Sequence, residues 1–311
     1  MATPTVPRIA FAADAEPWVV EAIAAGGGQP VGIDDAPEGL VWMDMASDRL
    51  SELRRLIDAH PGIRWVQLPV AGVEAAFEAG VVDGRRRWTS AKGAYAEPVA
   101  EHALALVLAG LRHLTERARA TSWGEPKGTT LFDQPVTIVG GGGITEAMLR
   151  LLAPFRVEAT VVREHPVPLP GARSTVSADA LVGSLRSATA VVLALALTPR
   201  SRGLIGQQEL AAMRRDAWLV NVGRGALVDT PALVEALRDR RIGGAALDVT
   251  DPEPLPPDHP LWQLDNCLVT PHTADTPDMV RPLLAGRISE NVRRFGASED
   301  LVGLVDPEAG Y

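Results

Sequence analysis

Four consecutive glycines at residues 140–143 follow a short apolar segment in the sequence TIVGGGGITEAML, residues 137–149. A glycine-rich turn between a strand and a helix lets backbone N–H groups approach a pyrophosphate, and the helix amino terminus adds partial positive charge. In such a dinucleotide-binding turn, Gly140 would make the tight turn and Gly142 would allow close approach, but Thr145 stands where a third glycine is expected. Taken alone, the segment indicates either a nucleotide site or a structural bend.

The residues that would select the nucleotide lie at the end of the next apolar segment, where ATVVREH places Arg163 and Glu164. Dinucleotide-binding units usually carry Asp or Glu here to bind the ribose hydroxyls, whereas an arginine suits a 2′-phosphate through a bidentate contact. Glu164 could still turn toward a plain ribose, and both side chains could instead be solvated loop charges. The pair favours NADP over NAD as the cofactor and leaves both open.

Other kinds of catalytic chemistry find little support in the sequence. The single cysteine, Cys267, lies in the apolar segment DNCLVTP, which is typical of a buried thiol rather than a nucleophile. No set of His, Cys and Asp shows metal-ligand spacing, and no serine occupies a nucleophile elbow. We therefore expect no metal site and no covalent serine or cysteine mechanism.

The elements that must position these residues alternate between strands and helices, which predicts α/β architecture with parallel sheets. In the first third, apolar residues recur at helical spacing between three short apolar runs. The alternation restarts at residue 136 with nearly continuous Val, Ala and Leu runs, as expected for strands covered on both faces. The expected strands are 8–13, 39–43, 64–69, 136–140, 157–162, 189–196, 217–223, 243–249 and 267–272. The expected helices are 16–26, 47–60, 143–154, 177–188 (capped by Ser177), 206–215, 230–241 and 276–295.

Between the two alternating parts, residues 96–120 show one long helical pattern, almost wholly apolar in its first half. The pattern indicates a helix buried on several sides that leaves the first domain and enters the second. Its apolar surface fits the core of its own subunit and a contact with a second subunit equally well.

Composition restricts the partners and the compartment. The 311 residues carry a formal net charge of −9, which disfavours a broad nucleic-acid interface. No apolar run approaches the roughly 20 residues that span a bilayer, and the first 18 residues lack the layout of a signal peptide. With one cysteine no internal disulfide can form, so we expect a cytoplasmic protein with no nucleic-acid or membrane partner.

Motifs from residue 60 onward closely resemble those of the D-2-hydroxyacid dehydrogenase family. The segments concerned are RWVQLPVAGVE, PVAEHALALVLAGLRHL, NVGRG, DVTDPEP and TPHTA. The resemblance implies an NAD(P)-dependent oxidoreductase that moves a hydride between nicotinamide and a small 2-hydroxy or 2-oxo acid, in the manner of a glyoxylate or hydroxypyruvate reductase. It also implies a homodimer. For each chain the resemblance implies two doubly wound domains. A Rossmann nucleotide-binding domain (93–283) would be inserted in a discontinuous flavodoxin-like substrate domain (1–92 and 284–311).

The same resemblance assigns roles to individual residues. Arg224 would hold the substrate carboxylate and carbonyl, His272 would be the acid–base, and Glu253 would partner that histidine. The backbone of Val70, Ala71 and Gly72 would bind the substrate carboxylate. The cofactor would contact Gly143, Ile144, Thr198, Val222, Gly223, Asp248, His272 and Ala274, in addition to Gly140, Gly142 and Arg163, which the glycine turn and the end of the next strand indicate by themselves. The departures from the family pattern are Thr145, Arg163 and Gly223.

The implied trio suits the reaction. Reducing a 2-oxo acid adds a hydride to the carbonyl carbon and a proton to its oxygen, and histidine is the natural donor near neutral pH. A carboxylate would fix its tautomer, and an arginine can bind a carboxylate and polarise a carbonyl. The remaining histidines lie on the long helix (His102, His113) or in loops and at element ends (His60, His165, His259) and suit catalysis less well. A non-catalytic nucleotide-sensing or scaffold protein remains the alternative, because Thr145 and Arg163 depart from the cofactor pattern.

Overall fold

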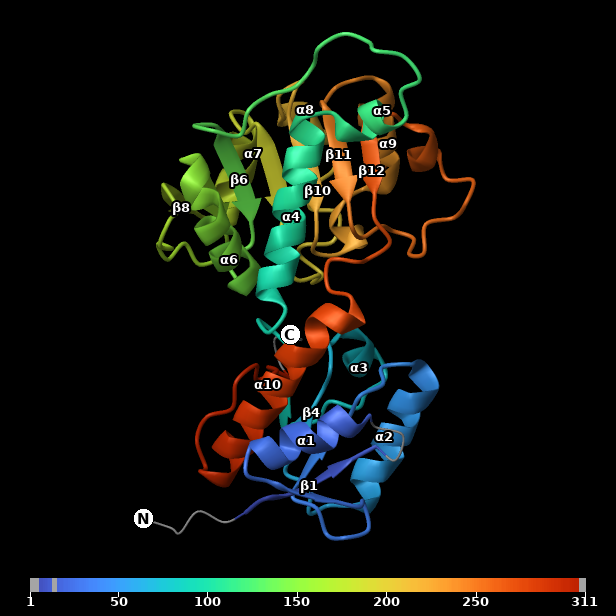
Figure 1. Ribbon diagram of the computed structural model, residues 1–311, viewed down its shortest axis with the longest axis vertical. Helices are drawn as coiled ribbons and strands as arrows, with labels where there is room; N and C mark the ends of the chain where they lie inside the picture. The colour runs from blue at the N-terminus through green and yellow to red at the C-terminus, as the bar shows by residue number, and fades with distance from the viewer. Residues whose placement is uncertain (1–5, 13–15, 308–311) are drawn as a thin grey trace. The chain divides into compact units, whose positions relative to one another are not determined.

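The computed structural model describes residues 6–12 and 16–307 and divides the chain into two compact units (Figure 1). One, here called the discontinuous unit, comprises Met1–Tyr95 and Thr276–Tyr311, and the other, the inserted unit, comprises Ala96–Asp275. The sequence places the divisions after residues 92 and 283, and the structure places them after 95 and 275. The second differs because Pro277–Gly296 forms one continuous helix.

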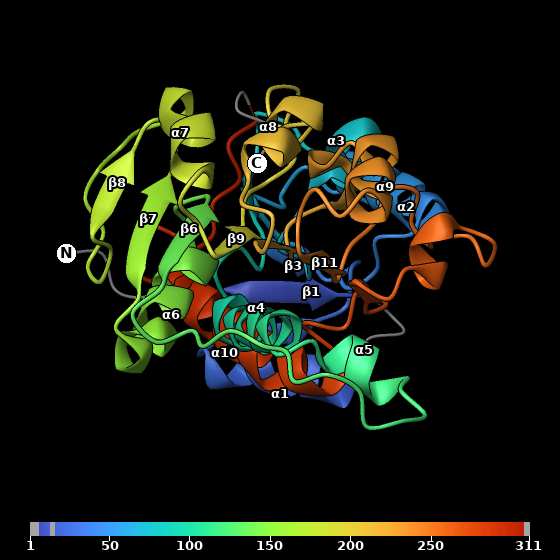
Figure 2. The same cartoon turned by 90° about the horizontal axis from the view of Figure 1, so that it is seen from above.

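The discontinuous unit is built on five parallel strands in the order β2-β1-β3-β4-β5. This is the flavodoxin-like order. The strands are β1 (Arg8–Phe11), β2 (Gln29–Val31), β3 (Gly39–Val41), β4 (Trp65–Gln67) and β5 (Arg87–Thr89). Helices α1 (Pro17–Ala25) and α10 (Pro277–Gly296) pack together on one face, and α2 (Ser47–Ala59) and α3 (Glu74–Glu78) cover the other (Figures 1 and 2).

Regular apolar spacing explains why the longer elements of this unit were predictable. Leu50, Leu53 and Ile57 are spaced three and four residues apart on α2, and all three are buried.

Strands β2 and β5 were not predicted, because each is three residues long and shows no apolar run. Their strand conformation comes from pairing with β1 and β4.

The inserted unit is built on seven parallel strands in the order β12-β11-β10-β9-β6-β7-β8. Counted from β6, this is the Rossmann order with one additional strand. The strands are β6 (Pro135–Val139), β7 (Glu158–Val162), β8 (Ser174–Val176), β9 (Ala190–Leu193), β10 (Trp218–Asn221), β11 (Gly244–Leu247) and β12 (Cys267–Val269). The helices are α4 (Ala96–Leu111), α5 (Leu114–Ala118), α6 (Gly143–Leu152), α7 (Leu181–Leu185), α8 (Gln207–Ala212) and α9 (Thr230–Arg238). Figure 2 shows α4 and α6 on one face of this sheet and α7, α8 and α9 on the other.

The prediction of one helix over residues 96–120 was wrong. Helix α4 ends at Leu111, and a separate helix α5 starts at Leu114. His113 between them has φ 51°, and its N–H donates to the Gly110 carbonyl at 2.9 Å, which closes a turn. Apolar periodicity does not reveal such a turn, because the spacing of apolar residues continues in phase on both sides of it.

The prediction of a serine-capped helix over residues 177–188 was also wrong in its details. The segment starts with a short 3₁₀ turn, Ala178–Ala180, before α7, and Ser177 makes no side-chain cap. Helix α9 is capped, since the Asp229 carboxylate accepts from the Ala232 N–H at 3.0 Å. Strand β8 was not predicted, because its three residues are only half-buried.

Each unit has its own apolar core. In the inserted unit, strands β9, β10 and β11 are buried along their whole length, as their continuous apolar sequences predicted. Cys267 is buried in the same core, and burial raises the pKa of its thiol to about 12. Within residues 6–12 and 16–307, no helix is both long enough and apolar enough to cross a bilayer.

Candidate active site

The carboxyl edge of the seven-stranded sheet collects the residues expected to bind cofactor and to do chemistry. The strands are parallel, so the loops that follow them leave from the same edge. The residues in these loops are Gly140, Gly142, Gly143 and Ile144 after β6, Arg163 after β7, Thr198 after β9, Val222, Gly223 and Arg224 after β10, Asp248 and Glu253 after β11, and His272 and Ala274 after β12. The inserted unit therefore supplies every predicted site residue except the three of the expected substrate loop.

The glycine turn has the geometry of an anion cradle. Gly140 has φ 112°, and a Cβ there would lie 2.2 Å from the Ala194 carbonyl oxygen, so only glycine fits. Gly142 precedes α6 in extended conformation, and a Cβ there would meet nothing within 4 Å. Gly143 and Ile144 begin the helix, where backbone N–H groups lack intrahelical acceptors. A helix amino terminus of this kind, with free N–H groups next to an unobstructed glycine, can bind a phosphate group.

Thr145 fills the place of the missing third glycine with a buried hydrogen bond. Its side chain is fully buried, and its hydroxyl donates to the Gly140 carbonyl at 2.9 Å. The bond ties the first turn of α6 to the glycine turn. The substitution is therefore compatible with a closed cradle, which the sequence alone could not establish.

Arg163 lies over the glycine turn. A Cβ on Gly141 would come within 2.7 Å of the Arg163 Cδ and Nε atoms, so the side chain crosses the backbone there. Its neighbour Glu164 forms an ion pair with Arg200 from the loop after β9. Both partners of that pair are largely exposed. Arg200 was not among the predicted site residues, because nothing in the sequence brings the loop after β9 to Glu164.

The loop that carries Arg224 is held by a buried amide. Asn221, at the end of β10, accepts from the Gly223 N–H at 3.0 Å and donates to the Arg224 carbonyl at 2.9 Å. Gly225 packs so closely that a Cβ would fall 1.9 Å from the carbonyl carbon of Thr250. These contacts fix the backbone on both sides of Arg224. Asn221 was not among the predicted residues, although NVGRG contains it.

His272 and Glu253 form a direct pair. The His272 Nδ1 atom lies 2.6 Å from the Glu253 Oε1 atom, and both side chains are about two-fifths exposed. The pair leaves the histidine Nε2 atom for other partners. His272 has φ 52°, an uncommon conformation for a residue with a side chain. The arrangement is that of an imidazole oriented by a carboxylate.

Asp248 is a buried carboxylate that binds the segment around His272. Its Oδ1 atom accepts from the Thr270 hydroxyl at 2.6 Å and the Thr273 N–H at 2.9 Å, and its Oδ2 atom from the Ala274 N–H at 3.1 Å. The His102 Nε2 atom from α4 lies 3.3 Å from Oδ1. Burial opposes ionisation, but the hydrogen bonds from His102, Thr270 and the two amides outweigh it and lower the pKa of Asp248 to about 2.

Two further side chains lie in this region without having been predicted. Asp275 is half-buried, and burial is the main cause that raises its pKa, while the charges of His272 and Arg224 oppose the rise. The Ser201 hydroxyl accepts a hydrogen bond from the Thr198 N–H at 2.7 Å and donates one to the Ala196 carbonyl at 2.9 Å. Ser201 thereby shapes the loop that contains Thr198.

The expected substrate loop belongs to the discontinuous unit. Val70, Ala71 and Gly72 follow the carboxyl end of β4 and precede α3. The Val70 carbonyl accepts from the Ala91 N–H at 2.8 Å, which holds the loop beside the end of β5. Ala71 is exposed, so backbone groups of this turn can be reached by a ligand.

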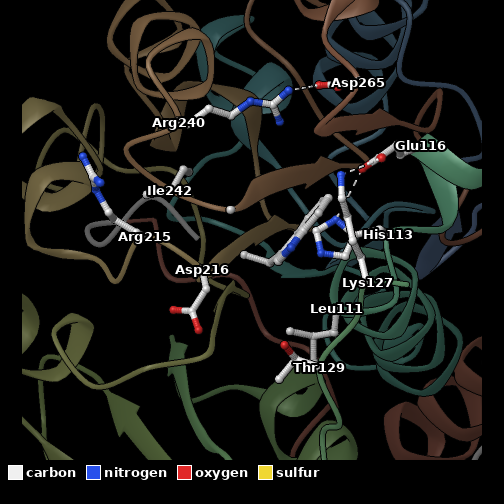
Figure 3. Close-up of a pocket in the computed structure, with 12 residues that line it drawn as sticks. Leu111, His113, Glu116, Lys127, Thr129, Arg215, Asp216, Arg240, Ile242 and Asp265 are labelled. Carbon is white, nitrogen blue, oxygen red and sulfur yellow. Dashed lines mark hydrogen bonds and ion pairs between the residues drawn. The ribbon is translucent and has the colours of Figure 1, made fainter. Parts of the chain in front are cut away.

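A cavity of about 460 Å³ lies at the other edge of the inserted unit's sheet (Figure 3). It is next to the amino ends of β10, β11 and β12, and none of the predicted site residues lines it. Two ion pairs cross its wall, Lys127 with Glu116 at 2.8 Å and Arg240 with Asp265 at 2.6 Å (Figure 3). The cavity is therefore separate from the expected cofactor edge.

Among residues 6–12 and 16–307, no three His, Cys, Asp or Glu side chains gather as metal ligands would. Of the acidic side chains at the carboxyl edge, Glu253 is paired with His272 and Asp248 accepts from the Thr273 and Ala274 amides.

Comparison with known proteins identifies the family. Residues 103–274 match the family model described as D-isomer specific 2-hydroxyacid dehydrogenase, NAD binding domain. The chain is 40% identical over 260 residues to the Corynebacterium melassecola protein described as an uncharacterized protein in the proB 3′ region, with 82% of this chain and 86% of that protein covered. It is 33% identical over 234 residues to a glyoxylate reductase of Aeropyrum pernix, with 71% and 69% covered.

A solved structure agrees with this family over nearly the whole chain. The D-isomer specific 2-hydroxyacid dehydrogenase of Xanthobacter autotrophicus Py2, in complex with NADPH and MES, superposes with a TM-score of 0.85 at 28% identity. The match covers 99% of this chain and 100% of that chain. This chain belongs to the D-isomer specific 2-hydroxyacid dehydrogenase family. It is an NAD(P)-dependent oxidoreductase of 2-hydroxy acids, as its motifs indicated.

Proposed function

We propose that this protein reduces a small 2-oxo acid such as glyoxylate or hydroxypyruvate, that it prefers NADPH, and that Arg224, Glu253 and His272 carry the reaction. The observation on which the proposal rests is the 2.6 Å pair between His272 and Glu253, at the same sheet edge as the glycine cradle. The relative from Aeropyrum pernix is named a glyoxylate reductase, which supports the substrate class.

In this mechanism Arg224 binds and polarises the substrate. Its guanidinium stays charged at neutral pH and can hold a carboxylate while drawing electron density from the adjacent carbonyl oxygen. Asn221 and Gly225 keep its backbone in place, so little reorganisation is needed on binding. The turn of Val70, Ala71 and Gly72, in the discontinuous unit, offers backbone N–H groups that can bind a carboxylate.

His272 donates the proton. Glu253 receives a hydrogen bond from Nδ1, which leaves Nε2 to deliver its proton to the carbonyl oxygen as the carbonyl carbon is reduced. In the reverse direction the same nitrogen accepts the hydroxyl proton. The ionised Glu253 stabilises the imidazolium form that donates.

The residues present fit a dinucleotide. The cradle formed by Gly140, Gly142, Gly143 and Ile144 suits the pyrophosphate, and Thr198, Val222, Gly223 and Ala274 would line the rest. Asp248 and His272 would lie at the nicotinamide end. When bound, the cofactor supplies the hydride. Arg163, across the glycine turn, would bind a 2′-phosphate, and Glu164 is paired with Arg200.

The catalytic roles are tested by turnover. Arg224→Ala and His272→Ala should abolish oxidation of NADPH by glyoxylate, hydroxypyruvate or pyruvate, while NADPH binding measured by fluorescence largely survives. Retained turnover in either variant would remove that residue from its role. If the wild-type protein binds NADPH but oxidises it with none of a broad panel of 2-oxo acids, the protein is instead a nucleotide sensor or scaffold.

The cofactor preference is tested at Arg163. Losing a hydrogen-bonded charge pair costs roughly 1.5–3 kcal/mol, so Arg163→Ala should weaken NADPH binding by about 10- to 100-fold and leave NADH binding nearly unchanged. Arg173→Ala is the matched control, because Arg173 pairs with Glu158 away from the glycine turn. Equal losses for both nucleotides would contradict the 2′-phosphate role.

We further propose a homodimer and a cytoplasmic location. Trp123 is 96% exposed, and α4 presents the exposed Ala105 and the partly exposed Leu104 and Leu108. Exposed apolar groups of this kind favour association with a second copy. Light scattering after size exclusion should give twice the 33.0 kDa chain mass, and Leu108→Glu should lower it. A wild-type monomer would refute the dimer, and secretion of the protein would refute the location.

A further inference from the structure

His102 is a half-buried histidine that the catalytic scheme does not use. It lies on α4, and its Nε2 atom is 3.1 Å from the Thr270 hydroxyl and 3.3 Å from the Asp248 Oδ1 atom. Its side chain is 22% exposed and that of Asp248 is 1% exposed. A buried carboxylate needs such a donor, because an unpaired charge in the interior is costly.

The same carboxylate determines the path of the segment that carries His272. The Asp248 carboxylate accepts from the Thr270 side chain and from the backbone of Thr273 and Ala274, on both sides of His272 in sequence. The His272 N–H itself donates to the Asp248 carbonyl at 2.9 Å. These bonds surround a residue held at φ 52°, a conformation that persists only when neighbouring contacts enforce it.

We propose that His102 is a positioning residue: through Asp248 and Thr270, it holds the segment 270–274 so that His272 faces Glu253. The connection runs from α4, on one face of the sheet, to the loop after β12 within the inserted unit. The His102 Nε2 atom contacts Thr270 and Asp248, so any effect on His272 is transmitted through these two residues. The consequence for turnover rests on the proposed acid–base role of His272.

The first experiment measures hydrogen exchange of the backbone amides in the segment around His272 and needs neither substrate nor cofactor. Hydrogen–deuterium exchange of a peptide covering residues 268–276 should be faster in His102→Leu than in wild-type protein, because the anchoring carboxylate loses a donor. His102→Gln, whose amide N–H₂ can replace the Nε2 donor, should restore slow exchange. His113→Leu is the matched control, since His113 contacts Trp218 and Glu116 and not this segment.

The second experiment separates positioning from general stability by kinetics with a 2-oxo acid. Misplacing a catalytic group by about 1 Å can cost about 100-fold, so kcat of His102→Leu should fall by up to that factor with a much smaller change in KM. His102→Gln should recover most of kcat. Because His102 and Thr270 act on one carboxylate, adding Thr270→Val to His102→Leu should lower kcat by less than the product of the single effects.

Specific results would overturn the proposal. Unchanged exchange at 268–276 in His102→Leu would show that the histidine does not hold the segment. Faster exchange with wild-type kcat, or strictly multiplicative effects with Thr270→Val, would show that His102 does not position His272. If His272→Ala itself keeps turnover, the proposed catalytic role fails, whereas the exchange comparison still decides whether His102 anchors the segment.

Discussion

At the scale of single residues, the candidate site depends on a few buried polar side chains that shape loops. Asn221 holds the loop before Arg224, Thr145 closes the glycine turn, and Asp248 holds the segment around His272. Each of them satisfies backbone groups that would otherwise be buried without partners. Their substitution should therefore cost stability as well as activity.

The ionised Asp248 should make stability depend on pH. Its folded-state pKa of about 2 lies below its ordinary value of 3.8, so its contribution is present above pH 3.8 and is lost as pH falls through about 2. A difference of this size corresponds to about 2 kcal/mol. Asp248→Asn should have a lower melting temperature than wild type at pH 6, and this difference in melting temperature should become smaller toward pH 2.5. A difference that does not change with pH would contradict the role of the charge.

The hydroxyl of Thr145 should contribute measurably to the inserted unit. Thr145→Val keeps the shape but leaves the buried Gly140 carbonyl without its donor, at a cost of about 1–3 kcal/mol. Thr145→Ser retains the hydroxyl and serves as the control. Thermal unfolding should show a clear loss for valine and a smaller one for serine, and equal losses would show that packing rather than the bond matters.

At the scale of elements, the candidate site is made of the short loops that follow the carboxyl ends of the parallel strands. Glycine residues allow these loops to pack closely against one another. Gly225 brings the loop after β10 against the backbone of Thr250, shortly before Glu253. The positions of Arg224 and Glu253 are thus linked by a backbone contact rather than by a side chain. The sequence shows glycines here, but not which backbone each of them meets.

Gly225→Ala should therefore impair activity far more than a typical glycine replacement. A Cβ would lie 1.9 Å from the Thr250 carbonyl carbon, so both loops must move. A shift of about 1 Å can reduce turnover by about 100-fold. Gly183→Ala on α7 is the control, because a Cβ there meets nothing within 4 Å, and its activity should match wild type. Near-normal kcat in Gly225→Ala would refute the linkage.

At the scale of the whole molecule, the chain forms two units with separate apolar cores. In the discontinuous unit, the fully buried Asn291 on α10 binds Gln67 on β4 and both backbone groups of Val302. This hydrogen-bonded cluster holds the last helix against the sheet that the first 95 residues form.

Disrupting that hydrogen-bonded cluster should destabilise the discontinuous unit and leave the inserted unit unaffected. Asn291→Ala removes three hydrogen bonds and should destabilise the discontinuous unit by on the order of 3 kcal/mol. Limited proteolysis should then cleave residues 6–95 earlier. NADPH binding at low temperature should remain within about twofold, because every predicted cofactor residue is in the inserted unit. A tenfold loss of NADPH affinity would show that the two units are coupled.

Much of the fold, and the sheet edge that carries the candidate site residues, could be predicted from sequence because the signals are local or are carried by family motifs. Continuous apolar runs predicted β9, β10 and β11, and helical spacing predicted α2 and α9. Strands β2 and β8 lie in no apolar run and exist through pairing with their neighbours. The turn at His113 is likewise set by backbone conformation, which periodicity does not report.

The sequence by itself determined the parallel architecture, the family and the chemical types at the sheet edge, because residue type and spacing encode burial, helix phase and motif. Only the tertiary structure decided that Thr145 closes the turn, that Arg163 crosses Gly141, and that Asp248 and His102 meet beside the segment of His272. These contacts join residues that are mostly distant along the chain, and their distances follow from how helices and strands pack rather than from any local pattern.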